Sequence, residues 1–256
     1  RLRGEVIMCG IVGYTGIKEA APILIEGLSK LEYRGYDSAG IAVENTKAAN
    51  PEIEVIKARG RLQALREMTD NGKAVKGCCG IGHTRWATHG EPSVVNAHPH
   101  CSKDRRIAVV HNGIIENYKE LREWLQKKGF VFVSETDTEV VVHLLDYYYK
   151  GSPLEAISKM LNRVRGSYAL GILFREFPGT IYAVRQDSPM IVGRSDKGNF
   201  IASDVPAILK YTKEVCYIDD RDIAELKQDG IRFFNTDGEV MVRLLLRNLA
   251  CLTRTF

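Results

Sequence analysis

Short apolar runs rich in β-branched and aromatic residues recur along the chain, and each of them predicts a β-strand. Ten runs of this kind cover residues 9–14, 39–44, 53–58, 80–86, 106–111, 168–174, 180–184, 199–202, 215–218 and 231–234. Apolar residues at helical spacing separate some of these runs. Many strands with helices grouped between them predict an α+β fold rather than strict βαβ alternation.

Four segments have the pattern of amphipathic helices. Leu24, Leu28 and Leu31 share one face of the first. A second begins near Tyr118, and Gly129 is placed to end it as the residue after the C-cap. The other two are a helix after residues 136–139, which have capping-box spacing, and a helix over 153–164.

Composition narrows the class of protein. The 256 residues are 45% hydrophobic with a formal net charge of +4, and the basic residues are scattered, so nucleic-acid binding is weakly supported. No apolar stretch approaches the ~18 residues of a membrane span, and the N-terminus is a poor signal peptide. The six cysteines lack the regular spacing of a disulfide framework, which is typical of the reduced thiols of cytosolic proteins. A cytoplasmic location is therefore expected.

Cys9 follows Met8 and opens the first apolar run. If Met8 were removed, Cys9 would carry both a thiol and a free α-amine. An α-amine titrates near ~7.7–8.0, so it can accept the thiol proton at neutral pH without a histidine. The alternative is a buried cysteine of ordinary packing in a first strand.

Residues 83–92 form a predicted strand that runs into a loop containing Gly90 and Pro92. Arg85 stands where that strand ends, and its guanidinium fork is suited to bind both oxygens of a carboxylate. A surface arginine beside an ordinary turn is the alternative reading.

His111, Asn112 and Gly113 are expected to end another strand. An asparagine amide together with the N–H of the following glycine can stabilise an oxyanion, because glycine permits close backbone approach. Asn-Gly is also the strongest short signal for a type I′ hairpin turn, which stays open as an alternative.

Asp137 is expected in the first turn of the third helix, where its carboxylate could favour the helix dipole or pair with an ammonium group. A metal site must also be weighed, because five possible ligands lie close in sequence: His83, His89, His98, His100 and Cys101. Their spacing matches no common zinc pattern, so no metal is expected.

Together these groups describe a pocket for a zwitterionic amide. Arg85 would bind an α-carboxylate and Asp137 an α-ammonium. Cys9 would attack the amide carbon while Asn112 and Gly113 hold the oxyanion. The substrate that fits this description is L-glutamine.

The chain also resembles a known family, the glutaminase domain of glucosamine-6-phosphate synthase (glutamine–fructose-6-phosphate aminotransferase). The motifs that carry the resemblance are residues 9–13 (CGIVG), 31–40 (LEYRGYDSAG), 83–92 (HTRWATHGEP), 96–100 (NAHPH), 111–117 (HNGIIEN) and 134–139 (SETDTE). They occur in order from Met8 to about Gly238, and they are long enough to be specific.

The resemblance implies an N-terminal-nucleophile hydrolase fold, a four-layer αββα sandwich of two antiparallel sheets. It implies glutamine hydrolysis through a Cys9 thioester without a cofactor. Thr88 and His89 would lie in the loop that closes over glutamine. Trp86 would be the gate towards an ammonia channel, and Arg34 would support the pocket near Cys9.

Two features depart from the family. Residues 1–8 precede the nucleophile, and residues 239–256 do not resemble the family after the expected 9–238 domain. The partners expected are L-glutamine and the sugar isomerase domains of a full-length enzyme, with a homodimer left open. If residues 1–8 are retained, the alternative is a catalytically silent glutamine-binding module.

Overall fold

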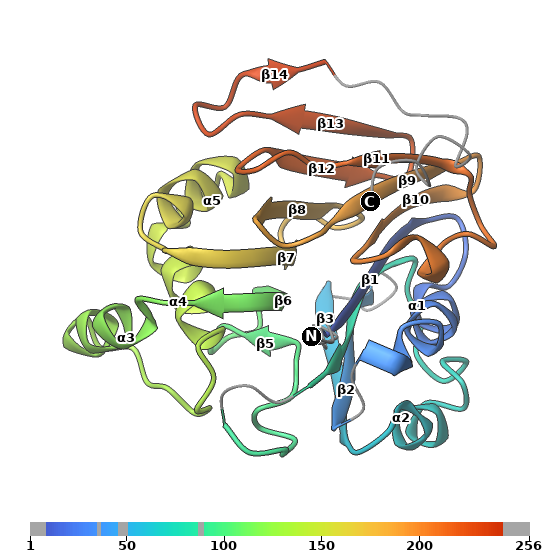
Figure 1. Ribbon diagram of the computed structural model, residues 1–256, viewed down its shortest axis with the longest axis horizontal. Helices are drawn as coiled ribbons and strands as arrows, with labels where there is room; N and C mark the ends of the chain where they lie inside the picture. Colours follow the sequence, from blue (N-terminus) through green and yellow to red (C-terminus); the bar gives the residue numbers. More distant parts are fainter. Residues whose placement is uncertain (1–8, 35–36, 46–50, 87–89, 243–256) are drawn as a thin grey trace, which may run out of the picture.

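The structure is a computed structural model, and it describes residues 9–34, 37–45, 51–86 and 90–242. Two antiparallel sheets of seven strands each occupy its centre (Figure 1). The first sheet contains, in spatial order, β11 (Glu214–Tyr217), β9 (Ile191–Ser195), β10 (Gly198–Ala202), β1 (Gly10–Gly16), β4 (Cys79–Arg85), β2 (Ser38–Asn45) and β3 (Glu52–Arg59).

The second sheet contains the short strands at its edges and the longest strands near one side. Its spatial order is β14 (Val240–Met241), β13 (Gly230–Phe234), β12 (Ile223–Lys227), β8 (Ile181–Gln186), β7 (Gly166–Phe174), β6 (Ile107–Ile115) and β5 (His100–Cys101). Every pairing between these named strands is antiparallel, as expected for strands joined by hairpins and long returns.

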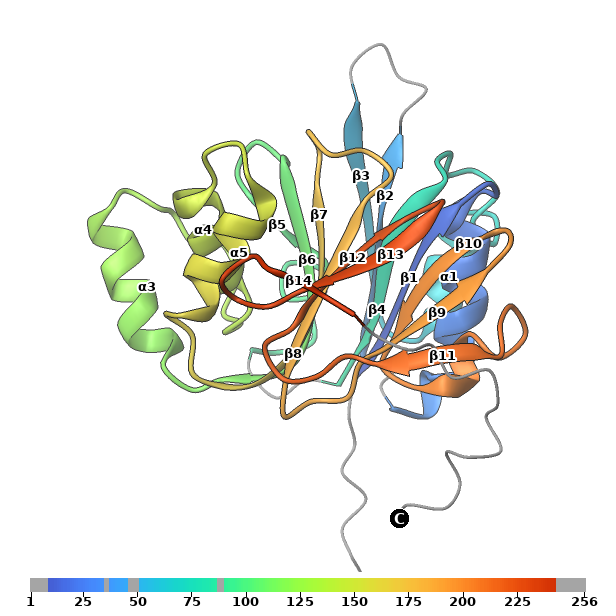
Figure 2. The ribbon, with the colours of Figure 1, turned by 90° about the horizontal axis from the view of Figure 1, so that it is seen from above.

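Helices cover the outer face of each sheet. Helices α1 (Ala20–Ser29) and α2 (Leu62–Met68) pack on the first sheet, whereas α3 (Tyr118–Lys127), α4 (Glu139–Tyr148) and α5 (Pro153–Leu161) pack on the second. Figure 2 shows the two helix layers on opposite sides of the paired sheets. Two 3₁₀ turns, η1 (Glu32–Arg34) and η2 (Val205–Ala207), complete the elements.

Three apolar cores follow from this layering. One lies between each sheet and its helices, and a third lies between the sheets, where Ile11 and Ile81 of the first sheet meet Val110 and Leu173 of the second. Strands buried on both faces explain why the sequence shows continuous apolar runs rather than strict alternation. The predicted four-layer αββα sandwich is confirmed.

The four predicted helices are present, and the end of α3 is as predicted. Gly129 has φ of +90°, and the N–H groups of Gly129 and Phe130 bond to the carbonyls of Gln126 and Leu125. This is the Schellman pattern that a glycine after the C-cap permits. The capping box was wrong, because α4 begins at Glu139 after Thr138 and has no side-chain cap.

The ten predicted strands all appear, but the sequence reading missed β5, β9, β12, β14 and the helix α2. In β9, Gly193 and Arg194 break the apolar run, and in β12 the buried Glu225 does so. Helix α2 has seven residues and buries only Leu62 and Leu65, too few to establish a helical period.

Candidate active site

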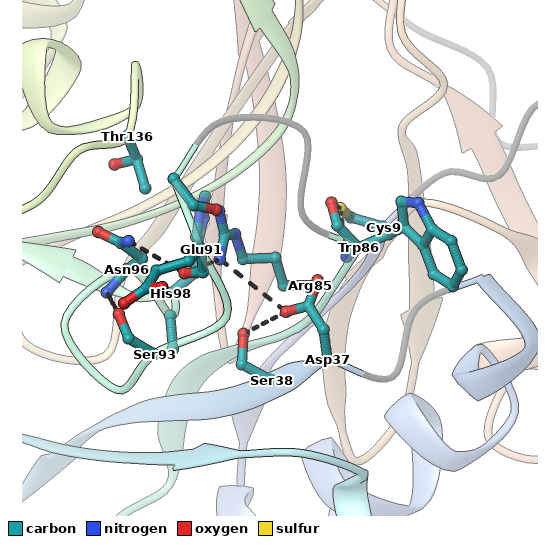
Figure 3. A network of polar contacts seen from close by, with 12 residues as sticks. Cys9, Asp37, Ser38, Arg85, Trp86, Glu91, Ser93, Asn96, His98 and Thr136 are labelled. Atoms are coloured by element: carbon teal, nitrogen blue, oxygen red, sulfur yellow. Dashed lines mark hydrogen bonds and ion pairs between the residues drawn. The ribbon is translucent and has the colours of Figure 1, made fainter.

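Cys9 lies directly before β1, beside the end of β4. Gly10 pairs with Thr84, so the cysteine sits next to the residues that leave β4. The backbone N–H of Trp86 donates to Cys9 Sγ at 3.2 Å. The thiol is half-buried, and Figure 3 shows it facing the backbone that follows Arg85.

The environment of the thiol opposes its ionisation. Burial raises the pKa of the Cys9 thiol to about 11, and the charge of Asp37 acts in the same direction. The Trp86 N–H and the Arg85 guanidinium act in the opposite direction but are outweighed. A thiol with this pKa needs a base that removes its proton as it attacks, because its thiolate is scarce at neutral pH.

Asn112 brings a side-chain amide to the same place. Its Nδ2 donates to the Cys9 carbonyl oxygen at 2.7 Å, and the side chain is buried. Asn112 and Gly113 do not end a strand and do not form a hairpin turn, because β6 continues to Ile115 and pairs both residues with β7. The expectation of a strand end was therefore wrong.

Gly113 has a conformation that only glycine tolerates at this point. Its φ is +118°, and a Cβ would lie 2.1 Å from the carbonyl oxygen of Ser167 on the neighbouring strand. Gly113 is exposed although it lies within the sheet. The glycine therefore leaves the surface open next to the Asn112 amide.

Arg85 is the last residue of β4, as predicted, and it is only 4% exposed. Its guanidinium donates to the carbonyl oxygens of Gly90 (2.9 Å) and Glu91 (3.4 Å). It also lies 3.9 Å from Asp37, whose carboxylate accepts a hydrogen bond from Ser38 (Figure 3). The cation is thus held in place by backbone carbonyls and one carboxylate.

Asp137 lies two residues before α4, not in its first turn, so that expectation was wrong. Its Oδ2 accepts a hydrogen bond from the backbone N–H of Ile115 at 2.7 Å, and the side chain is 5% exposed. Ile115 is two residues beyond Gly113 on β6. Asp137 is therefore tied to the strand that carries the Asn112 amide.

Asn96 connects the loop beside Arg85 to the segment that bears Asp137. Its Nδ2 donates to the Glu91 carbonyl (3.0 Å) and to Glu135 Oε2 (3.3 Å), and its Oδ1 accepts from the Glu135 N–H (3.0 Å). Figure 3 shows the Asn96 side chain beside Glu91. The sequence contained Asn96 in one of the family motifs but gave it no role.

The remaining predicted site residues are only partly described. Trp86 is half-buried and contacts Cys9 through its backbone. Thr88 and His89 lie outside the described residues, and of Arg34 only the backbone, at the end of η1, is described. Within the described part of the chain, no group of three or more histidine, cysteine, aspartate or glutamate side chains is arranged to hold a metal ion.

Two solved structures share this architecture. The glutamine phosphoribosylpyrophosphate amidotransferase from B. subtilis superposes with a TM-score of 0.77 at 24% identity, over 91% of this chain and 50% of that one. A glutamine aminotransferase class-II domain protein from Silicibacter pomeroyi gives 0.62 at 16% identity, over 89% and 99%. The chain therefore shares the fold of these two proteins.

The family model described as "Glutamine amidotransferase domain" matches residues 83–210, which is half of the chain. The chain therefore belongs to the glutamine amidotransferase domain family.

Closely similar relatives are longer proteins. The glutamine–fructose-6-phosphate aminotransferase [isomerizing] of Clostridium acetobutylicum is 57% identical over 232 residues, which is 91% of this chain and 37% of the relative. A protein of the same name from Thermus thermophilus is 49% identical over 92% of this chain and 38% of the relative. The chain thus spans little more than a third of the relatives it matches.

Proposed function

We propose that the chain hydrolyses L-glutamine to glutamate and ammonia, with Cys9 as the nucleophile. The observation that carries this proposal is that the Asn112 amide and the backbone at the end of β4 both contact Cys9. The Asn112 Nδ2 contact to the Cys9 carbonyl is 2.7 Å and the Trp86 contact to the sulfur is 3.2 Å. The family match supports the reaction class.

Glutamine would bind with its α-carboxylate on Arg85 and its α-ammonium on Asp137. Both groups are buried and anchored by backbone hydrogen bonds, so little ordering is needed when the ligand arrives. Binding both ends of the amino acid would direct the side-chain amide towards Cys9.

The reaction would begin when the Cys9 α-amine takes the thiol proton and the sulfur attacks the amide carbon. The Asn112 amide and the Gly113 N–H would stabilise the oxyanion, where one lost donor raises the barrier by ~3–4 kcal/mol. The C–N bond then breaks, and the α-ammonium returns its proton to the departing nitrogen as ammonia forms. Water, deprotonated by the same amine, cleaves the thioester and releases glutamate and the thiol.

In a full-length protein this domain would supply ammonia for glucosamine 6-phosphate synthesis, because the relatives carry the name glutamine–fructose-6-phosphate aminotransferase. Its partners would be the sugar isomerase domains. Residues 9–238 would form the glutaminase domain. Thr88 and His89 would close over glutamine, Trp86 would gate the ammonia path and Arg34 would support the pocket.

The test compares the chain that begins at Cys9 with the chain that retains residues 1–8. Only the first has an α-amine on Cys9, so we expect glutamine hydrolysis from it and almost none from the extended form. Its kcat/KM should rise with pH as the amine loses its proton near ~7.7–8.0. Equal activity in both forms would refute the role of the amine.

Intact-mass spectrometry of the purified protein decides which form is present. A chain that starts at Cys9 supports the enzyme. A retained extension combined with glutamine binding and no turnover would favour a silent binding module instead.

A further inference from the structure

Four buried histidines gather around β6 beside Asn112, and the reaction described above uses none of them. His83, His98, His100 and His111 are each at most 5% exposed. We propose that His83 is a positioning residue that fixes the amide of Asn112 with its NH₂ group towards Cys9. The proposal rests on the proposed function, because that orientation matters for an oxyanion formed at Cys9.

The orientation of the Asn112 amide follows from its neighbours. The Cys9 carbonyl can only accept a hydrogen bond, so the group 2.7 Å from it must be the NH₂ of Asn112. The amide oxygen then points the other way, to His83 Nε2 at 3.0 Å. A flipped amide would set two acceptors against each other at Cys9.

The same reasoning fixes the proton on His83. Its Nε2 contacts two acceptors, Asn112 Oδ1 at 3.0 Å and the carbonyl oxygen of His111 at 2.9 Å. Only a protonated Nε2 satisfies both, so His83 is the Nε2–H tautomer. No described residue gives its Nδ1 a hydrogen-bond partner, in agreement with an unprotonated nitrogen there.

The surroundings keep His83 neutral and still. Burial lowers the pKa of His83 to about 3, although its contacts to Asn112 and His111 act in the opposite direction. Its ring stacks on that of His98 with centroids 4.2 Å apart and planes 13° apart. Two neutral rings can stack in this way without charge repulsion, so the donor to Asn112 is held in one place.

A second set of hydrogen bonds fixes the ring of His98, on which His83 stacks. The N–H of His111 donates to His98 Nδ1 at 3.2 Å, so the proton of His98 is on Nε2, which faces the Thr138 hydroxyl at 3.4 Å. That hydroxyl is also 2.8 Å from His111 Nδ1. Thr138 follows Asp137, so the network joins the segment that contains Asp137 to β6, the strand that carries Asn112 and Gly113.

If His83 acts through Asn112, its loss should lower kcat more than it raises KM, because the amide matters most once the oxyanion forms. Asn112→Ala should lower kcat about 10²- to 10³-fold. His83→Phe, which keeps a flat ring but no donor, should lower kcat about tenfold. The kcat of the double variant should lie within about threefold of the kcat of Asn112→Ala, because the effects of two residues that act as a unit do not add.

Two further variants separate positioning from folding. His83→Gln offers an N–H donor at similar reach and should restore kcat to within about threefold of the original. His143→Phe removes another buried histidine, one packed against Phe130 and Phe132 on the helix layer, and should leave kcat unchanged. Losses of His83→Phe and Asn112→Ala that multiply, or a slow His83→Gln, would overturn the proposal.

A direct readout does not depend on activity. Nitrogen NMR of the full chain with labelled histidine, with His83→Phe to assign the signals, should show His83 protonated at Nε2 and not at Nδ1. The opposite tautomer would overturn the positioning role. If the tautomer is as expected but the chain beginning at Cys9 never hydrolyses glutamine, the proposed function fails while the hydrogen bond stands.

Discussion

The two ends of the β1–β4 strand pair both bury polar side chains, but they use them differently. Gly10 pairs with Thr84 at one end, and Thr15 pairs with Cys79 at the other. The first end carries Cys9, His83 and Arg85. The second end holds Glu44 of β2, which is 3% exposed.

At the second end the polar groups join the two sheets. Glu44 Oε2 accepts a hydrogen bond from the N–H of Gly179 at 2.6 Å, and the Thr15 hydroxyl donates to the carbonyl of the same glycine at 2.7 Å. Gly179 lies between β7 and β8 of the opposite sheet. Burial raises the pKa of the Glu44 carboxyl to about 8, although the Gly179 N–H opposes this.

A perturbed pKa therefore does not by itself mark a reactive group in this protein. Glu44 and Cys9 both have raised pKa values, and burial is the main cause for each. The two residues differ in their neighbours. The groups around Glu44 connect one sheet to the other, whereas the groups around Cys9 lie next to the exposed Gly113. Geometry separates the proposed catalytic end from the structural end.

The largest effect on activity is expected from substitution of Cys9, at the proposed catalytic end. Cys9→Ala should reduce glutamine hydrolysis about 10⁴-fold or more, because no other group replaces the nucleophile. The measurement is glutamate release by the chain that begins at residue 9. Cys216→Ser on β11 is the matched control and should keep its activity; if Cys9→Ala stays active, the reactive end has been misassigned.

Glu44→Gln tests the structural end. A carboxyl whose pKa is near 8 when folded and 4.5 when unfolded binds more protons in the folded state, so stability falls as pH rises through that interval. Each pH unit contributes on the order of 1.4 kcal/mol. The glutamine side chain introduced at position 44 mimics the protonated carboxyl. The free energy of unfolding of the variant should therefore exceed that of the original protein by a few kcal/mol at pH 8 and equal it near pH 4.

Urea unfolding at both pH values measures that difference. The activity of Glu44→Gln should stay within about twofold of the original at equal folded fraction. A difference in stability that does not change between pH 4 and pH 8 would show that Glu44 is not protonated in the folded protein.

Asp137→Asn sharpens the proposed binding role. The amide oxygen can still accept the hydrogen bond from Ile115, so the fold should persist while the charge is lost. Loss of a charged contact to the ammonium is worth about 1.5–3 kcal/mol, so KM for glutamine should rise roughly 10- to 100-fold. Steady-state kinetics in which kcat falls and KM is unchanged would remove Asp137 from substrate binding.

Asn96→Ala has the smallest expected effect. It would release the loop at Glu91 from the segment at Glu135, so the two ends of the site would no longer keep a fixed separation. We expect KM to rise about tenfold with little change in kcat. Ser93→Ala removes the hydroxyl that accepts a hydrogen bond from the Asn96 N–H and serves as the control; equal KM changes in both variants would indicate general loosening of the loop.

Much of the fold was predictable because strands that are buried on both faces leave long apolar runs in the sequence. The end of α3 was predictable because Gly129 readily adopts the positive φ that the residue after the C-cap has. The placement of Asn112 inside β6 was not, since Asn-Gly ordinarily signals a turn and the pairing partner, Ala169, lies on β7, beyond α3, α4 and α5 in the sequence. The role of Asn96 was hidden as well. Its partners include the backbone of Glu91 and Glu135, and residue letters do not specify such contacts.

The central claim is that the sulfur of Cys9 attacks the amide carbon of glutamine. Labelling the chain that begins at Cys9 with an electrophilic glutamine analogue, followed by peptide mapping, tests it most directly. The account predicts one modified residue, Cys9, and protection of that residue by excess glutamine. Modification at Cys78, Cys79, Cys101, Cys216 or Cys251 in its place would contradict it.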